Sequence, residues 1–274
     1  MSQMSADLKT VLQAGRRVYG TLVTSSTPMW PPFIQRTGVD FVFIDTEHVA
    51  LDRETVSWMC RAYAALGITP IVRIPSPCPY AACQVLDGGA HGVVAPYVET
   101  VAQVRDLVGA VKYRPLKGER LHAALAGRGQ LEPLLDEYLA ARNSHRLCIV
   151  NIESQPALDN LDEILAVPGL DVVLIGPHDL SCSLGIPEEY DAPQFDTAVR
   201  EIIGKARAAG VAAGIHLFYG NLEHEVAWGQ HGANFILHSG DIFLVEQNLR
   251  CEINELRSRL GDELVAIAQR DPAI

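Results

Sequence analysis

Two carboxylates and a histidine follow directly on an apolar run near the start of the chain. Residues 41–48 read FVFIDTEH, so four apolar side chains lead into Asp45, Glu47 and His48. Such groups are costly to remove from water unless they are paired or bind a metal. Histidine is also a candidate general base, because its ordinary pKa lies near neutral pH. Either this run simply reaches solvent, as an ordinary polar turn, or it delivers these groups to an active site.

Two more carboxylates end later apolar runs. Glu153 ends the run 147–153, and Asp179 follows the run 171–176. Neighbouring parallel strands lie about 4.8 Å apart, so carboxylates at their ends can bind one cation together, and Mg²⁺ typically takes one or two of them. Without a cation the pair repels, and one carboxylate takes up a proton. A metal site is the favoured interpretation; separate roles as a helix cap or an arginine partner are the alternative.

Arg73 and the segment IGPHDLS (175–181) are candidates for binding an anionic substrate. Arg73 ends an apolar run, and its planar guanidinium can hold a carboxylate through two hydrogen bonds, although a structural ion pair fits its position equally well. Backbone N–H groups near His178 and Asp179 can point at an anion if the turn before them begins a helix. The alternative makes Asp179 an ordinary N-cap.

Asp87, in AACQVLDGGAH (81–91), is a carboxylate that can orient His48 as a base. His216 and His238 end the last two apolar runs, and either can line a substrate pocket.

Eight short β-rich runs, each followed by a helical pattern, position these residues. Strands are expected over 19–25, 41–45, 70–74, 92–98, 147–153, 171–176, 211–217 and 234–239. Helices are expected over 29–37, 52–66, 80–86, 101–113, 157–167, 194–209, 221–230 and 241–260. Most of the strands are continuously apolar, as in a parallel sheet that is buried on both faces.

Eight such units predict an α/β fold, a (β/α)₈ TIM barrel, in which catalytic residues lie at the C-terminal ends of the strands. A doubly wound open sheet is the alternative, but the first turn has no GxGxxG. We expect one domain over residues 1–274, with an N-terminal helix. The segment 114–146 is an insertion, expected to give a loop over the barrel mouth and one helix.

The composition limits which classes of binding partner and which cellular location we expect. The net charge of −11 argues against nucleic acid and anionic membranes, because both need basic patches. No apolar run approaches the ~18 residues of a membrane span, and the N-terminus lacks the apolar core of a secretory signal. The six cysteines form no CxxC pair and are expected to be reduced thiols. We therefore expect a cytoplasmic globular protein.

Five motifs together resemble those of the HpcH/HpaI family of class II, metal-dependent pyruvate aldolases, which includes 4-hydroxy-2-oxoheptanedioate aldolase and macrophomate synthase. They are DTEH (45–48), PIVR (70–73), QVLDGGAHGVVAPYV (84–98), VNIES (150–154) and IGPHDLS (175–181). The resemblance runs from about residue 8 to about residue 250. It implies a barrel whose C-terminal helix swaps between subunits of a homohexamer, a trimer of dimers.

The resemblance also implies a role for each site residue. Glu153 and Asp179 would hold Mg²⁺, Mn²⁺ or Co²⁺, and Asp45 and Glu47 would bind the waters of the ion. Arg73 would stabilise an enolate. The other implied roles are binding of the pyruvate carboxylate by the backbone amides of His178 and Asp179, and proton transfer by His48 paired with Asp87.

The implied reaction is cleavage of a 4-hydroxy-2-oxo acid to pyruvate and an aldehyde. No lysine lies at an expected strand end, which disfavours a Schiff-base route. Oxaloacetate decarboxylation and a macrophomate-synthase-like condensation use the same enolate and are the alternatives. A barrel that binds a keto acid without turning it over is disfavoured, because simple binding needs no base.

The chain departs from the family pattern around the aldehyde. Where the family has a glycine-rich GxRGxG loop, residues 118–124 read GERLHAA, which keeps Arg120 as a substrate-binding candidate. His216 stands where relatives have an apolar residue, and Tyr219, His238 and Asp241 add polarity. We therefore expect a polar or anionic aldehyde, with the histidines lining its subsite.

Overall fold

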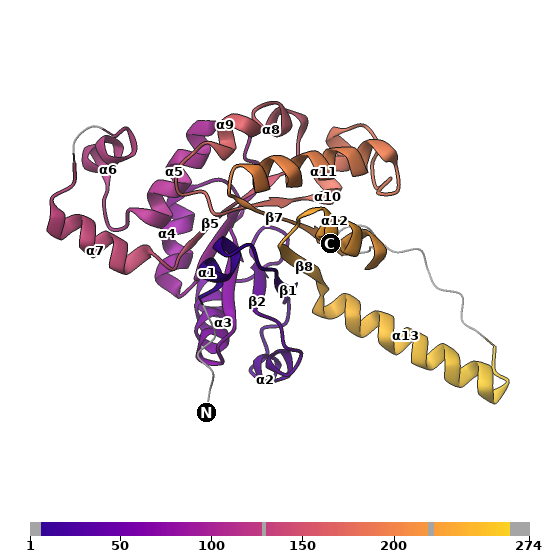
Figure 1. The fold of residues 1–274 in the computed structure, drawn as a ribbon. Helices are drawn as coiled ribbons and strands as arrows, with labels where there is room; N and C mark the ends of the chain where they lie inside the picture. The colour runs from indigo at the N-terminus through magenta and orange to yellow at the C-terminus, as the bar shows by residue number, and fades with distance from the viewer. Residues whose placement is uncertain (1–6, 128–129, 219–221, 264–274) are drawn as a thin grey trace.

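Eight parallel strands close into a barrel in the computed structural model, which describes residues 7–127, 130–218 and 222–263. They pair in chain order, and β8 returns to β1. The strands are β1 Val18–Leu22, β2 Phe41–Asp45, β3 Thr69–Arg73, β4 Gly92–Ala95, β5 Leu147–Ile152, β6 Val172–Ile175, β7 Ala212–Leu217 and β8 Phe235–Gly240. The predicted (β/α)₈ TIM barrel is confirmed (Figure 1).

Helices follow the strands around the barrel. They are α1 Leu8–Gln13, α2 Trp30–Gln35, α3 Arg53–Ala65, α4 Pro79–Gly88, α5 Val101–Lys112, α6 Gly118–Leu125, α7 Pro133–Asn143, α8 Gln155–Asp159, α9 Leu161–Leu165, α10 Pro177–Ser183, α11 Pro193–Ala208, α12 Leu222–His231 and α13 Asp241–Leu260. The single helix expected over 157–167 is broken into α8 and α9 at Asn160, whose side chain donates a hydrogen bond to the Glu99 carbonyl at 2.9 Å.

Aromatic packing fills the barrel at the N-terminal ends of its strands. The rings of Phe41 and Phe235 stack with centroids 4.4 Å apart. A Cβ at Gly20 would lie 2.3 Å from the Phe41 ring, so only glycine leaves room for that ring. This apolar packing closes one end of the barrel, and the buried polar groups Asp45, Arg73 and His216 lie at the other.

The segment 114–146 differs from its prediction. It forms two helices, α6 and α7, which lie beside α5 on the flank of the barrel (Figure 1). A Cβ at Gly109 of α5 would lie 2.9 Å from Leu125 of α6, so this glycine allows the two helices to approach closely. None of the described residues of this segment lines the cavity at the barrel mouth. The expected loop over the mouth is therefore replaced by a helical pair at the side.

Helix α13 extends away from the barrel instead of packing against it (Figure 1). Six large apolar side chains along it are exposed: Ile242, Val245, Leu249, Ile253, Leu256 and Leu260. A cavity of about 880 Å³ lies between α2, α12 and the first turns of α13. Among the described residues, no helix is long and apolar enough to cross a membrane.

Candidate functional site

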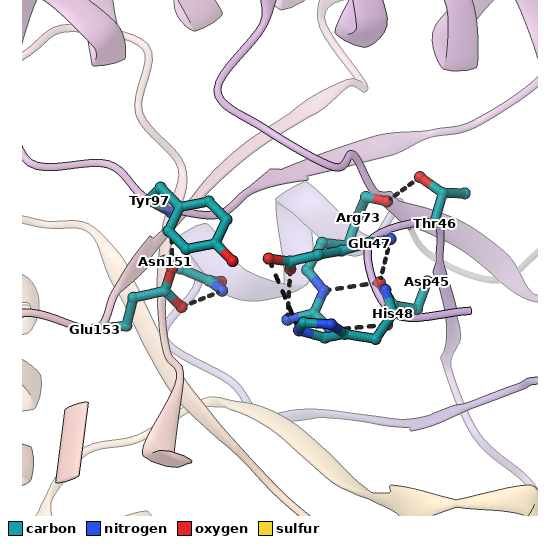
Figure 2. A network of polar contacts seen from close by, with 8 residues as sticks. All are labelled: Asp45, Thr46, Glu47, His48, Arg73, Tyr97, Asn151 and Glu153. Atoms are coloured by element: carbon teal, nitrogen blue, oxygen red, sulfur yellow. Dashed lines mark hydrogen bonds and ion pairs between the residues drawn. The ribbon is translucent and has the colours of Figure 1, made fainter. Parts of the chain in front are cut away.

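Arg73 pairs with both carboxylates of the DTEH segment (45–48). Asp45 and Arg73 are register partners at the ends of β2 and β3. Nε and Nη2 of Arg73 donate to the two Asp45 oxygens at 2.8 and 2.7 Å, and Nη1 lies 3.0 Å from Oε2 of Glu47. Burial alone would raise the pKa of Asp45, but the hydrogen bonds and charge of Arg73 outweigh it and hold this pKa below its ordinary value. Figure 2 shows the network.

Glu153 is a second buried carboxylate, beyond the end of β5. Its side chain accepts hydrogen bonds from the Tyr97 backbone N–H at 2.7 Å and from the Asn151 side chain at 2.8 Å (Figure 2). Burial is the main reason that its pKa rises to about 7, and the negative charges of Asp179 and Glu47 add to the rise. At neutral pH, this carboxylate is therefore poised to exchange its proton for a cation.

Gly176, at the end of β6, leaves the space that Glu153 occupies. A Cβ at this position would lie 2.4 Å from Oε2 of Glu153. Gly176 is also the N-cap of α10, which places His178 and Asp179 in the first turn of that helix. The alternative of Asp179 as the N-cap is therefore wrong. The N-cap Gly176 makes no side-chain capping hydrogen bond, and residues 176–179 line the cavity at the barrel mouth.

A cavity of about 370 Å³ occupies the mouth of the barrel. It is lined by Leu22, Phe43, Asp45, His48, Val49, Arg73, Asn151, Leu174, Ile175, Gly176, Pro177, His178, Asp179, Glu188, Tyr190, His216, Leu217 and Phe218. The structure thus brings together six predicted site residues from the ends of β2, β3 and β7 and the first turn of α10: Asp45, His48, Arg73, His178, Asp179 and His216. His178 lies at the rim, with 56% of its side chain exposed.

His216, on β7, lines this cavity as a buried and neutral group. Its side chain is buried between the rings of Phe43 and Phe218, with centroid distances of 5.3 and 3.8 Å. Burial lowers its pKa to about 3, although a contact of 3.2 Å between Nε2 and the Ser239 carbonyl opposes the shift. His216 therefore offers a hydrogen-bonding ring without a charge.

Asp87, the predicted partner of His48, does not line the mouth cavity of its own chain. Asp87 pairs with Arg114, its side chain is 69% exposed, and it lines a different cavity, beside α3 and α4. His48 instead has Nε2 3.7 Å from Oε1 of Glu47. The expected pair of His48 and Asp87 is therefore not formed in this chain, because α4 turns Asp87 outward.

Arg120, on α6, pairs with Glu132 and has 53% of its side chain exposed at the flank of the barrel. This placement removes it from the mouth cavity of its own chain. The cause is the helical fold of the segment expected to cover the mouth.

Two other polar residues, His238 and Asp241, make their contacts outside the mouth cavity. His238 contacts Glu225 at 2.8 Å in the cavity beside α13, and this contact raises the pKa of His238. Asp241 accepts hydrogen bonds from the backbone N–H groups of Thr24 and Ser25. Tyr219 lies outside the described residues.

The sequence analysis missed Tyr97 and Asn151. The strand β4 ends at Ala95, earlier than expected, so Tyr97 follows its end with a left-handed φ of 55°. A hydrogen bond to Glu47 is the main cause that raises the pKa of its phenol to about 12. Asn151 is a polar residue within the apolar run LCIVNIE, two residues before Glu153. A polar side chain in a buried strand is the sequence signal that could have identified it.

The residues present fit a divalent cation. Glu153 is buried beside other negative charges, and the Oδ1 atom of Asn151 is buried without a hydrogen-bond partner. Among the described residues, no group of three or more His, Cys, Asp or Glu side chains is arranged to hold a metal. Two carboxylates suffice for Mg²⁺, which completes its coordination with waters and substrate oxygens.

Known proteins share both the sequence and the fold. Residues 19–246 match the family described as HpcH/HpaI aldolase/citrate lyase. The chain belongs to this family. It is accordingly a carbon–carbon lyase, and the resemblance noted from the five motifs is confirmed.

Individual HpcH/HpaI relatives cover nearly all of the chain. A 2-keto-3-deoxy-L-rhamnonate aldolase of Salmonella gallinarum is 33% identical over 256 residues, which is 93% of this chain and 94% of that protein. The crystal structure of the citrate synthase SbnG has a TM-score of 0.79 at 32% identity, covering 94% of this chain and 99% of that one. An HpcH/HpaI aldolase from Desulfitobacterium hafniense has a TM-score of 0.79 at 26% identity, covering 96% and 99%.

Proposed function

We propose that this enzyme is a metal-dependent class II aldolase that cleaves a 4-hydroxy-2-oxo acid to pyruvate and an aldehyde. The observation that carries the proposal is the buried Glu153, whose pKa is raised to about 7 by burial and by the charge of Asp179, and which is hydrogen-bonded to Asn151 of the cavity lining. A carboxylate in this setting binds a cation more readily than it stays ionised alone. The similarity to 2-keto-3-deoxy-L-rhamnonate aldolases supports the reaction class.

Glu153 and Asp179 would hold Mg²⁺, Mn²⁺ or Co²⁺. When bound, such an ion supplies positive charge beside the keto oxygen of the substrate. Arg73, fixed by Asp45 and Glu47, presents a second positive charge to the same oxygen, where negative charge develops as the C3–C4 bond breaks. Backbone N–H groups of His178 and Asp179 bind the carboxylate of the 2-oxo acid.

His48 takes the proton of the C4 hydroxyl as the C3–C4 bond breaks and the aldehyde leaves, and a proton delivered to C3 of the enolate from His48 or water then gives pyruvate. It lines the cavity, and 50% of its side chain is exposed, so it reaches both substrate and solvent. A placed general base typically contributes roughly 10²–10⁴ in rate. If Asp87 orients His48, it does so from a neighbouring subunit, because the two line different cavities of one chain.

The enzyme assembles through α13. Its exposed apolar side chains and the open cavity between α2 and α12 match an exchange of this helix between two copies of the chain. A monomer would leave both surfaces in water, which soluble proteins rarely do on this scale. Exchange within a dimer covers both surfaces, and the homohexamer, a trimer of such dimers, rests on the resemblance to the family.

Pyruvate release from a panel of 4-hydroxy-2-oxo acids and oxaloacetate tests the proposal. Release that requires Mg²⁺, Mn²⁺ or Co²⁺ and disappears with EDTA and in Glu153→Gln supports an aldolase. Release from oxaloacetate alone would instead assign the decarboxylase or condensing alternative, which the similarity to a citrate synthase also favours. Release that survives in Glu153→Gln would contradict the metal-site assignment.

A further inference from the structure

A turn between α10 and α11 brings a third acidic side chain to the mouth cavity. Glu188 lines this cavity together with His178 and Tyr190. Oε1 of Glu188 lies 3.6 Å from Nδ1 of His178, and 51% of the Glu188 side chain is exposed. The proposed cleavage assigns no role to this carboxylate.

The backbone holds Glu188 in a costly conformation. Its φ of 61° lies in the left-handed region, which is sterically unfavourable for a residue with a Cβ. Three contacts fix this turn: the Glu188 N–H donates to Oγ of the fully buried Ser181 at 3.0 Å, the Tyr190 N–H donates to the Glu188 carbonyl at 2.9 Å, and Oγ of Ser181 donates to the His178 carbonyl at 2.7 Å. The carboxylate therefore projects from a rigid support, as binding groups do.

Among the described residues that line the cavity, no lysine or arginine pairs with Glu188, and His178, 3.6 Å away, is the group beside it that can carry a positive charge. Arg73 is the one lysine or arginine among the residues that line the cavity, and Asp45 and Glu47 already pair with it. His216 is neutral, because burial holds its pKa near 3. An anionic group at the rim would thus meet a negative charge, whereas a hydroxyl group can donate a hydrogen bond to it.

Tyr190 supplies the complementary group. Burial is the main reason that the pKa of its phenol rises to about 12, so the hydroxyl keeps its proton at neutral pH. Its ring packs against Phe195 with centroids 5.3 Å apart, which holds the residue in place. A fixed acceptor and a fixed donor at one rim suit the hydroxyl groups of a neutral ligand, since each hydroxyl both donates and accepts.

We propose that Glu188, with His178 and Tyr190, forms a subsite that selects neutral hydroxyaldehydes over aldehydes with a carboxylate. This subsite rests on the proposed aldolase function and specifies its substrate class. It narrows the expectation of a polar or anionic aldehyde to the uncharged, hydroxylated kind. A hydrogen bond to a charged group typically contributes about 1.5–3 kcal/mol, which corresponds to roughly 10–150-fold in selectivity.

The test is aldol addition of pyruvate to glyceraldehyde, propanal and succinic semialdehyde by the metal-loaded enzyme. We expect kcat/KM to be at least about tenfold higher for glyceraldehyde than for either other aldehyde. In Glu188→Gln, the ratio of succinic semialdehyde to glyceraldehyde should rise about tenfold, and Glu188→Lys should raise it further. Glu189→Gln, at the next residue and outside the cavity lining, is the matched control and should keep the original ratio.

Two results would overturn the subsite: a wild-type preference for succinic semialdehyde, or a ratio that Glu188→Gln leaves unchanged in an active enzyme. A complete lack of addition to all three aldehydes would instead refute the proposed aldolase function, and the subsite with it.

Discussion

The raised pKa of Glu153 makes the stability of the metal-free protein depend on pH in a predictable direction. Burial raises this pKa from 4.5 to about 7. The folded state therefore binds the proton more tightly than the unfolded chain does. The stabilisation is complete below pH 4.5 and is lost as the pH rises through about 7. At 1.36 kcal/mol per pKa unit, the loss amounts to about 3 kcal/mol.

Glu153→Gln isolates this effect, because glutamine has nearly the same shape and does not titrate. We expect the free energy of unfolding of the wild type, in EDTA, to fall by about 2.5 kcal/mol more than that of the variant between pH 5 and pH 8.5. Urea unfolding at constant protein concentration measures both curves. All other titrating groups are shared, so the difference between the curves reports Glu153.

A metal ion should reverse the loss in the wild type alone. At a free Mg²⁺ concentration about 100 times its Kd, binding to the folded state adds about 2.7 kcal/mol. Glu163→Gln, on the exposed surface of α9, is the control and should follow the wild-type curve with and without Mg²⁺. Parallel pH curves for wild type and Glu153→Gln would refute the reasoning, since Glu153 would then ionise equally in the folded and unfolded states.

Three further predictions follow from the packing. Gly176→Ala places a Cβ against the Glu153 carboxylate and should lower the pyruvate-forming kcat/KM at least about 100-fold. Gly204→Ala, on α11, where an added Cβ would make only an ordinary contact of 3.9 Å with His231, should keep wild-type activity. His216 should stay neutral down to about pH 4, because burial lowers its pKa to about 3, so its imidazole NMR shifts should not change between pH 8 and pH 5; a shift change near pH 6.5 would contradict this. Leu249→Asp, on the exposed stripe of α13, should lower the oligomeric state seen by sedimentation velocity, and Gln247→Asp, on the opposite face, should not.

The sequence predicted the barrel well because one physical rule dominates it. Continuous apolar runs such as 41–45 and 171–176 must be buried on both faces, so their number and order define a parallel barrel, and the polar residues that follow them must meet at one end. Asp45, Arg73, His216 and Asp179 all met there for this reason.

The placements that the sequence did not predict have the opposite cause, since they depend on packing between elements. The outward turn of Asp87 follows from its pairing with Arg114, and the flank position of Arg120 follows from the packing of α6 on α5. Tyr97 acts through its backbone N–H, which is a feature of geometry that residue type does not encode. Glu188 was missed because its position depends on a turn held by Ser181.

Exchange of the methyl protons of pyruvate with D₂O, followed by NMR, tests the central claim most directly. It requires only that the site bind pyruvate and stabilise its enolate, and it needs no knowledge of the aldehyde. We predict exchange by the Mg²⁺-, Mn²⁺- or Co²⁺-loaded enzyme that stops with EDTA and falls at least about 100-fold in Glu153→Gln and Arg73→Ala. No exchange by the folded, metal-loaded wild type, or equal exchange by these variants, would contradict the claim that this barrel mouth is a pyruvate enolate site.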